Sequence, residues 1–230
     1  MSHAADRARW IEQLFPREIV SYALDEQGHP PALMLEEEIS VKNAVAKRRL
    51  EFARGRACAR LACRDLGRPH QAIPKGSERA PIWPSGLTGS ITHCPGLVAA
   101  IVARASSYAA VGIDAEPRET LASDIAARIG TQRERAQLND LAEFEPEVRG
   151  RLLFSAKEVV HKCIQPLTGT FLDFLDVFVH FEVDQSRFTV EPMTRLAGSI
   201  RQVKAISGRY CLTDEHLIAV GWIDAGDEQI

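Results

Sequence analysis

Apolar positions follow the strand pattern in several parts of the chain. Seven consecutive apolar residues at 97–103 are typical of a buried strand, and residues 109–114 predict a second one. Stretches rich in β-branched and aromatic residues predict three further strands near the carboxy terminus, at 177–183, 188–192 and 217–223. Strands are therefore predicted near 97–114 and again from 177 onward.

Two long segments carry helical signals. The acids Glu36 to Glu38 favour the positive end of a helix dipole, and good helix formers run from about Val41 to Leu66. We expect one long, arginine-rich helix there. A mainly helical stretch is expected at 123–163, with breaks at Gly130 and Pro146.

The segment between the first helix and the first strand is rich in proline and glycine. This composition predicts an irregular loop at 73–90. The loop leads to Ser90-Ile91-Thr92-His93, at the start of the next strand. Those four residues are therefore candidates for a polar loop at a site.

The two halves of the sequence resemble each other. Arg49-Leu50-x-Phe52 returns as Arg151-Leu152-x-Phe154, and residues 97–101 resemble residues 217–221. Chance similarity of short apolar strings is the alternative. A duplication predicts an α+β pseudo-dimer, with a long helix packed on a small antiparallel sheet in each half and a cleft between the halves. We expect the halves to be 1–112 and 113–230.

Composition narrows the class of protein. Apolar residues make up 45% and charged residues 26%, as in soluble globular proteins, and the net charge of -3 gives no general attraction to nucleic acid. The apolar run at 97–103 is far shorter than the roughly 20 residues of a membrane-spanning helix. The amino terminus lacks a secretory signal, so a cytoplasmic location is expected. Five scattered cysteines indicate neither a zinc site nor a disulfide framework.

Acidic side chains in two distant segments suit one metal ion. Asp114 and Glu116 alternate along a predicted strand and share a face. Glu158 and Lys162 are one helical turn apart, with Lys157 on the same arc. Carboxylates that fill part of an octahedron, with phosphate oxygens completing it, are typical of magnesium bound to a diphosphate. For the helix alone, an ordinary solvated face is the alternative.

The arginine-rich helix adds a candidate phosphate site. Arg49, Arg56 and Arg60 fall within about 40° of one another on a helical wheel, with Phe52 beside them. Guanidinium groups next to an aromatic ring suit a phosphate and a purine. An exposed charged face is the alternative.

Several motifs in a fixed order resemble the 4'-phosphopantetheinyl transferases of the surfactin and enterobactin type. The resemblance covers about residues 36–162. Its motifs are Arg48-Arg49 with Phe52, Gly55-Arg56, Lys75-Gly76, Trp83-Pro84, Gly89-Ser90-Ile91-Thr92-His93-Cys94, Val111-Gly112-Ile113-Asp114-Ala115-Glu116 and Phe154-Ser155-x-Lys157-Glu158-x-x-x-Lys162. Val159, where many members have alanine, departs from the pattern and points to the core.

The resemblance implies a fold, a reaction and a set of site residues. The fold is the pseudo-dimeric α+β fold of the family. In the reaction, the phosphopantetheine arm of coenzyme A moves to a serine of an apo carrier protein, and adenosine 3',5'-bisphosphate is released. The implied cofactor is Mg²⁺, with Mn²⁺ as an alternative. The metal ligands are Asp114, Glu116 and Glu158, and the catalytic residues are Glu158, Lys157 and Lys162. The residues implied to bind coenzyme A are Arg48, Arg56, Lys75, Gly76, Thr92, His93, Lys157 and Lys162.

Partners follow from the same resemblance. Apo carrier proteins of siderophore, non-ribosomal peptide, polyketide or fatty-acid synthesis are expected, with no nucleic acid and no transmembrane segment. The expected docking surface contains Arg118, Arg128, Arg133 and Arg135, and ordinary surface arginines are the alternative. A pseudo-dimer completes its own cleft, so a monomer is expected. Two alternatives remain: a coenzyme A or nucleotide binding module without chemistry, and a magnesium-dependent phosphohydrolase or nuclease.

Overall fold

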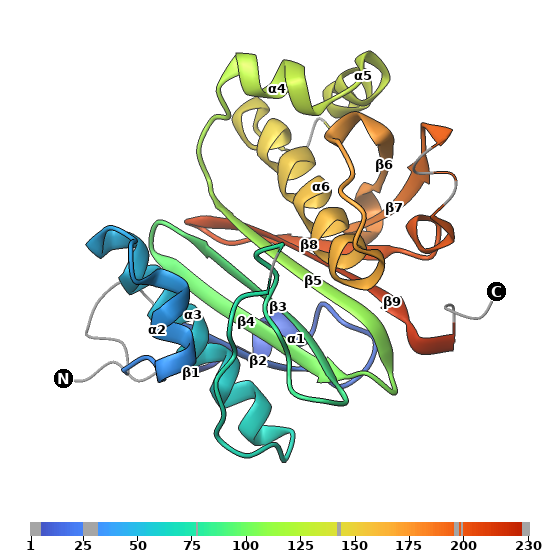
Figure 1. The fold of residues 1–230 in the computed structure, drawn as a ribbon. Coiled ribbons are helices and arrows are strands. Elements are labelled where there is room, and N and C mark those ends of the chain that lie inside the picture. Colours follow the sequence, from blue (N-terminus) through green and yellow to red (C-terminus); the bar gives the residue numbers. More distant parts are fainter. Residues whose placement is uncertain are drawn as a thin grey trace.

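The computed structural model describes residues 6–24, 32–76, 78–141, 144–195, 198 and 200–226. Two antiparallel sheets meet in the middle of the molecule, and each carries one long helix (Figure 1). The α+β fold with two similar halves, predicted from the sequence, is confirmed. Within the described ranges no helix is both long enough and apolar enough to cross a membrane.

The first sheet has the strand order β1-β2-β4-β3. Its strands are β1 (Asp6–Arg7), β2 (Val20–Leu24), β3 (Leu87–Cys94) and β4 (Leu97–Arg104). The strand β4 lies between two neighbours and under helix α3 (Ala46–Asp65), so all of it except Arg104 is buried. A side chain at Gly55 of α3 would meet Ile91 at 2.8 Å, so glycine permits this close approach.

The second sheet has the order β5-β9-β8-β7-β6. Its strands are β5 (Tyr108–Pro117), β6 (Val177–Glu182), β7 (Arg187–Pro192), β8 (Ser207–Leu212) and β9 (His216–Asp224). Helix α6 (Pro146–Thr168) packs on β5 and β9. Val159 of this helix is fully buried, as the helical wheel predicts.

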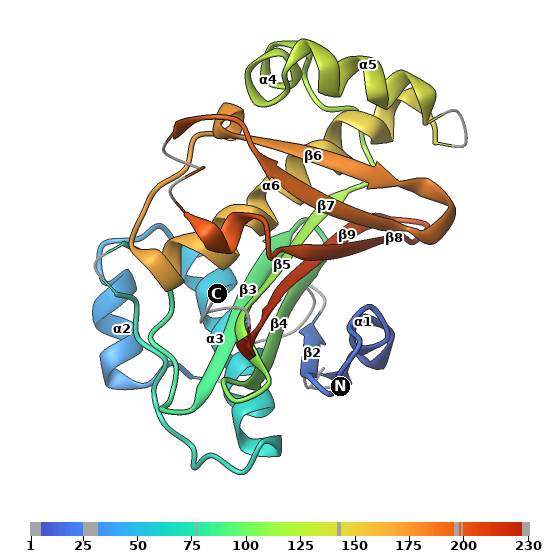
Figure 2. The same ribbon diagram turned by 90° about the vertical axis from the view of Figure 1, so that its right-hand side faces the viewer.

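Shorter helices complete the two halves. Helices α4 (Ser123–Ile129) and α5 (Gln132–Asp140) lie beside α6, at the end of the molecule away from the first sheet (Figure 2). Helix α2 (Leu35–Val41) lies beside α3, and α1 (Arg9–Glu12) precedes β2. The 3₁₀ turns are η1 (Phe174–Asp176), η2 (Val183–Gln185) and η3 (Arg201–Val203).

The two sheets are joined where β3 runs beside β5. Buried Thr92 Oγ1 accepts a hydrogen bond from the Ala115 N–H at 2.9 Å. An apolar cluster contains residues of both sheets, among them Ile101 and Ile218. The strand β5 pairs with β9 from Tyr108 onward and spans the predicted boundary between residues 112 and 113.

Two local expectations are wrong. The single helix from the acidic run to Leu66 is two helices, because the chain turns after Val41 and is extended at Val45 before α3 begins. The segment Ser90–His93 lies inside strand β3, not in a loop. The strands β2, β3 and β8 were not anticipated.

Candidate functional site

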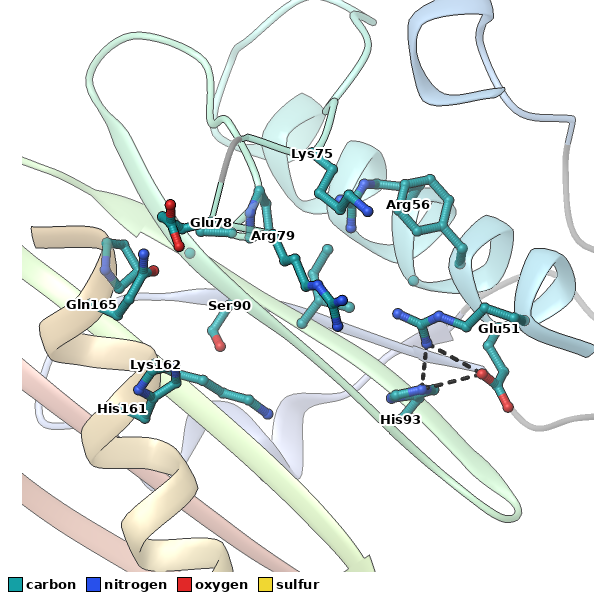
Figure 3. Close-up of a pocket in the computed structure, with 18 residues that line it drawn as sticks. Glu51, Arg56, Lys75, Glu78, Arg79, Ser90, His93, His161, Lys162 and Gln165 are labelled. Carbon is teal, nitrogen blue, oxygen red and sulfur yellow. Dashed lines mark hydrogen bonds and ion pairs between the residues drawn. The ribbon is translucent and has the colours of Figure 1, made fainter. Parts of the chain in front are cut away.

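A cavity of about 340 Å³ lies between the two halves. Helix α3, the turn after Lys75 and strand β3 form one wall, and α6 forms the other (Figure 3). Its ionisable lining residues are Arg48, Glu51, Arg56, Lys75, Glu78, Arg79, His93, His161 and Lys162. The first half contributes most of the positive charge, and α6 contributes Lys162.

Arg56 is the most firmly held of the arginines that line this cavity. Its guanidinium lies 4.1 Å from the centre of the Phe52 ring, and its Nε donates to the Ile73 carbonyl at 2.6 Å. Burial lowers the pKa of Arg56 to about 10. The side chain therefore keeps its positive charge at neutral pH.

Arg48 and His93 form a second basic group with Glu51. Arg48 Nη1 lies 2.6 Å from His93 Nε2, and Glu51 Oε2 lies 3.2 Å from each of these atoms. Dashed lines mark the three contacts in Figure 3. Burial and the Arg48 charge both lower the pKa of His93, which favours a neutral ring.

A tight turn brings Lys75 and Arg79 to the cavity. The Gly76 N–H donates to the Ala80 carbonyl at 2.8 Å, and the Arg79 N–H donates to the Gly76 carbonyl at 3.1 Å. Arg79 has a left-handed backbone with a φ of 68°. Lys75 and Arg79 line the cavity, while Gly76 shapes the turn between them.

Lys162 links the cavity to the acidic residues. Its Nζ donates to Asp114 Oδ1 at 2.7 Å and to the Ile113 carbonyl at 2.9 Å. Asp114 is buried, and its Oδ2 atom has no hydrogen-bond partner among the described residues. An unpaired buried carboxylate oxygen is costly unless a cation or donor reaches it.

The negative charge of Asp114 acts on the carboxyl groups of Glu116 and Glu158. Burial raises the pKa of both carboxyl groups, and the Asp114 charge raises them further. Glu116 forms an ion pair with Arg151. No three acidic, His or Cys side chains of the described ranges converge as a ready-made metal cluster. The donor chemistry still suits a hard cation, because Asp114 has a free oxygen and the acids repel one another.

A second cavity, of about 390 Å³, lies on the other side of His161. It is lined by Arg128, Lys157, Glu158, Val160, His161, Phe171, Leu172, Asp173, Phe174 and Val177. The His161 ring meets the Phe171 ring edge-on at 4.7 Å and lines both cavities. Glu158 therefore lines the second cavity and not the first, and the two cavities share His161.

Comparison with known proteins agrees with this geometry. The family model described as "4'-phosphopantetheinyl transferase N-terminal domain" matches residues 35–103, and the "4'-phosphopantetheinyl transferase superfamily" model matches residues 110–220. The 4'-phosphopantetheinyl transferase Npt of Nocardia iowensis is 40% identical over 76% of this chain and 78% of its own. The chain belongs to the 4'-phosphopantetheinyl transferase family.

Two further relatives support this assignment. The 4'-phosphopantetheinyl transferase Svp of Streptomyces mobaraensis is 44% identical over 72% of this chain and 68% of its own. Enterobactin synthase component D of Salmonella typhi is 35% identical over 53% of this chain and 50% of its own. The chain is therefore an enzyme of the 4'-phosphopantetheinyl transferase class.

The fold of the transferase brings together most of the residues that the sequence predicts to bind coenzyme A. Arg48, Arg56, Lys75, His93 and Lys162 all line the first cavity, the one of about 340 Å³ between the halves. They come from two helices, a strand and a turn.

Two expected coenzyme A residues have other contacts. Lys157 is buried, and its Nζ donates to Glu134, to the Phe174 carbonyl at 2.6 Å and to the Val177 carbonyl at 3.0 Å. All three N–H donors of Lys157 are therefore occupied within the protein. Thr92 Oγ1 is engaged with the β5 backbone.

The predicted row of three arginines is not one phosphate-binding face. Arg60 forms a buried ion pair with Glu37. Arg49 donates to the Val41 carbonyl at 3.1 Å. Only Arg56 of the three lines the cavity, because Glu37 and the end of α2 engage the other two.

The sequence did not single out several lining residues. The sequence could have indicated Glu51, because it lies three residues after Arg48 and therefore on the same face of the helix. The same holds for Gln165, which follows His161 by four residues on α6. No sequence pattern indicates Arg79, because its position in the cavity depends on the conformation of the turn.

Proposed function

We propose that this transferase moves the 4'-phosphopantetheine arm of coenzyme A to a serine hydroxyl of an apo carrier protein in a magnesium-dependent reaction. The product released is adenosine 3',5'-bisphosphate. One observation carries the proposal: Lys162 of the second half lines the cationic cavity of the first half and donates to the Asp114 carboxylate. Both walls come from one chain, which supports action as a monomer.

The first half would hold the nucleotide end of coenzyme A. Arg48, Arg56, Lys75 and His93 line one cavity and offer donors for the 3'-phosphate and the diphosphate. Gly76 would act through the turn that carries Lys75, and Thr92 through its bond to β5. Lys162 supplies a donor from the opposite wall for the diphosphate.

The acids Asp114, Glu116 and Glu158 would hold Mg²⁺, or Mn²⁺, against the diphosphate. The unpaired Asp114 oxygen supports this role, as do the raised pKa values of Glu116 and Glu158. A bound divalent ion supplies Lewis-acid stabilisation of the phosphate charge. The division into a nucleotide half, 1–112, and a metal-binding half, 113–230, follows from these roles.

Glu158 would accept the serine proton, directly or through a water that it orients. The serine oxygen forms a bond to the β-phosphorus while the bond from that phosphorus to the bridging oxygen breaks. A carboxyl group whose pKa is raised is a better base than an ordinary one. Lys157 would assist by fixing the turn of α6 that carries Glu158, since its own donors are occupied.

The carrier would dock around the second cavity, which gives access to Glu158 from outside. Phe171 lines this cavity and is 72% exposed. Leu175 and Ile125 are also exposed and lie on η1 and α4, two elements that contact each other. Arg128 lines the same opening. These residues make an apolar patch with a positive edge, which suits a carrier that is acidic around its serine.

The other arginines of the expected docking surface have closer partners. Arg118 pairs with Glu145, Arg133 stacks on Phe178 at 4.5 Å, and Arg135 donates to the Gly130 carbonyl. Arg128 is therefore the one we assign to the carrier. A siderophore carrier is the first choice of partner, because a relative is named enterobactin synthase component D.

A mass measurement tests the function. The protein is incubated with coenzyme A, Mg²⁺ and an apo carrier, and the carrier is weighed. We expect a gain of one phosphopantetheine group. Free phosphopantetheine without carrier modification would favour a phosphohydrolase, and binding of coenzyme A without any product would favour a binding module.

Asp114→Asn tests the metal assignment. It removes the charge but keeps the size of the side chain and its contact with Lys162. We expect transfer to fall at least about a hundredfold, because the electrostatic stabilisation of phosphate charge is lost. Calorimetric titration with Mg²⁺ in the presence of coenzyme A gives a readout independent of activity. Unchanged transfer and unchanged Mg²⁺ binding would rule out Asp114 as a ligand.

A further inference from the structure

A carboxylate lies on the wall of the cavity proposed for the nucleotide. Glu51 Oε2 is 3.2 Å from Arg48 Nη1 and 3.2 Å from His93 Nε2. The Glu51 side chain is 18% exposed, against 50% for Arg48 and 44% for His93. The acid is therefore more deeply placed than the two basic groups it contacts.

Negative charge at this position opposes the binding of a phosphate. Like charges a few ångströms apart repel each other appreciably near a protein surface. If Glu51 were a bystander, it would only weaken the affinity for an anionic ligand. Its position between two basic side chains gives it a different role.

The hydrogen-bond inventory shows how the three side chains fit together. The Arg48 guanidinium has only donors, so its 2.6 Å contact with His93 Nε2 requires an unprotonated Nε2 and a proton on Nδ1. Glu51 then accepts a hydrogen bond from Arg48 alone. The carboxylate holds the guanidinium against the imidazole ring.

Holding a long side chain in place favours ligand binding. A free arginine loses rotamer entropy when a ligand fixes it, and this loss is smaller when the free protein already restrains the side chain. Arg48 is half exposed, and its guanidinium forms hydrogen bonds or ion pairs with Glu51 and His93 but with no other residue in the described part of the chain. Glu51 is thus the acid that restrains it.

We propose that Glu51 is a positioning residue for the nucleotide end of coenzyme A. It holds Arg48 against His93, so that the remaining N–H donors of this pair meet the 3'-phosphate in a fixed arrangement. The inference rests on the proposed function, which puts that phosphate in this cavity. Glu51 touches no ligand atom and acts through Arg48 and His93.

Glu51→Gln tests the proposal by calorimetric titration with coenzyme A and with 3'-dephospho-coenzyme A. The two ligands differ only in the phosphate concerned. We expect the variant to bind coenzyme A roughly tenfold more weakly, as for loss of a charged hydrogen bond, with unchanged affinity for the dephospho form. Tighter or unchanged coenzyme A binding would overturn the proposal. Equal weakening for both ligands would overturn it as well, because it would indicate general damage.

Glu78→Gln is the matched control. Glu78 lines the same cavity, is exposed, and has no hydrogen bond or ion pair with any described residue. Removal of this charge without loss of positioning should leave coenzyme A binding equal or tighter. If Glu51 is a positioning residue, Glu51→Gln therefore weakens coenzyme A binding and Glu78→Gln does not.

The wild-type protein separates this inference from the proposed function. If the Glu51→Gln variant prefers coenzyme A over the dephospho form as strongly as the wild type does, the role of Glu51 is overturned and the proposed function is not. A wild type that transfers phosphopantetheine without such a preference overturns the location of the 3'-phosphate, and the role of Glu51 with it. Thermal unfolding of each variant checks that the fold is kept.

Discussion

Single buried charges hold the second half of the chain together. Glu134 accepts a hydrogen bond from the Thr131 N–H at 2.8 Å and from the Val179 N–H at 3.0 Å, and its carboxylate lies 2.9 Å from Lys157 Nζ. Both side chains of the ion pair are fully buried. The pair joins α5, α6 and β6, and it fixes the residue that precedes Glu158. The ion pair therefore engages a lysine that the sequence predicts to bind coenzyme A.

Lys157→Met tests this ion pair. The variant fills the volume but leaves the Glu134 charge buried and unpaired. We expect the free energy of unfolding to fall by about 3–5 kcal/mol, the usual range for breaking a buried pair from one side. Urea unfolding measures it.

The double variant Glu134→Gln with Lys157→Met is the control. It removes both charges, so part of the lost stability should return. A single variant that loses less than about 1 kcal/mol, in the range of an exposed pair, would contradict a structural role for Lys157.

At the scale of elements, glycine decides how closely helices approach strands. A Cβ atom at Gly112 of β5 would lie 2.9 Å from the Val159 carbonyl oxygen and 2.9 Å from Cys163 Sγ, both on α6. The helix that carries Glu158 therefore rests directly on the strand that carries Asp114. The sequence motif predicts both elements, but their separation depends on this contact.

Gly112→Ala should push α6 away from β5. We expect a loss of about 1–3 kcal/mol of stability, as for other overpacked positions, measured by urea unfolding. Coenzyme A affinity should also fall, since Lys162 and Asp114 would move apart.

Gly150→Ala in the same helix is the matched control. Its added Cβ would lie 3.4 Å from Leu121 Cβ, which is an ordinary van der Waals distance. We expect a neutral to stabilising change of up to about 1 kcal/mol, because alanine favours helix more than glycine. Equal losses for the two variants would contradict the close-approach argument.

At the scale of the molecule, the two halves keep equivalent contacts and differ in chemistry. Arg49 donates to the Val41 carbonyl at 3.1 Å, and its counterpart Arg151 donates to the Glu119 carbonyl at 2.8 Å. Arg49 ties α3 to the end of α2, and Arg151 ties α6 to the segment that follows β5. Two turns further along, Arg56 of one helix corresponds to Glu158 of the other. Arg56 lines the first cavity, and Glu158 lines the second.

Thr92→Val tests the joint between the halves. Valine keeps the shape of threonine but leaves the buried Ala115 N–H without its acceptor. We expect a loss of about 1–3 kcal/mol, the range for an unsatisfied buried donor. Thr92→Ser keeps the hydroxyl and should lose less. Similar unfolding curves for the valine variant and the wild type would show that the hydrogen bond does not hold the halves together.

The sequence by itself determined the α+β class, the repeated helix and sheet, and the candidate acids and bases. These depend on local periodicity and on residue types in a fixed order, which a chain carries in its primary structure. Asp114 and Lys162 are an example, because the strand and helix patterns alone make them candidates for one site.

Only the tertiary structure decided which charged side chains face the cavity. Arg56 and Arg60 share a helical face, yet one lines the cavity and the other is paired with Glu37. Lys157 and Lys162 belong to one motif, yet Glu134 engages the first and Asp114 the second. The partners are distant in sequence, so periodicity carries no information about them. Burial and pairing of charges are set by what packs against a helix, and that is a property of the whole fold.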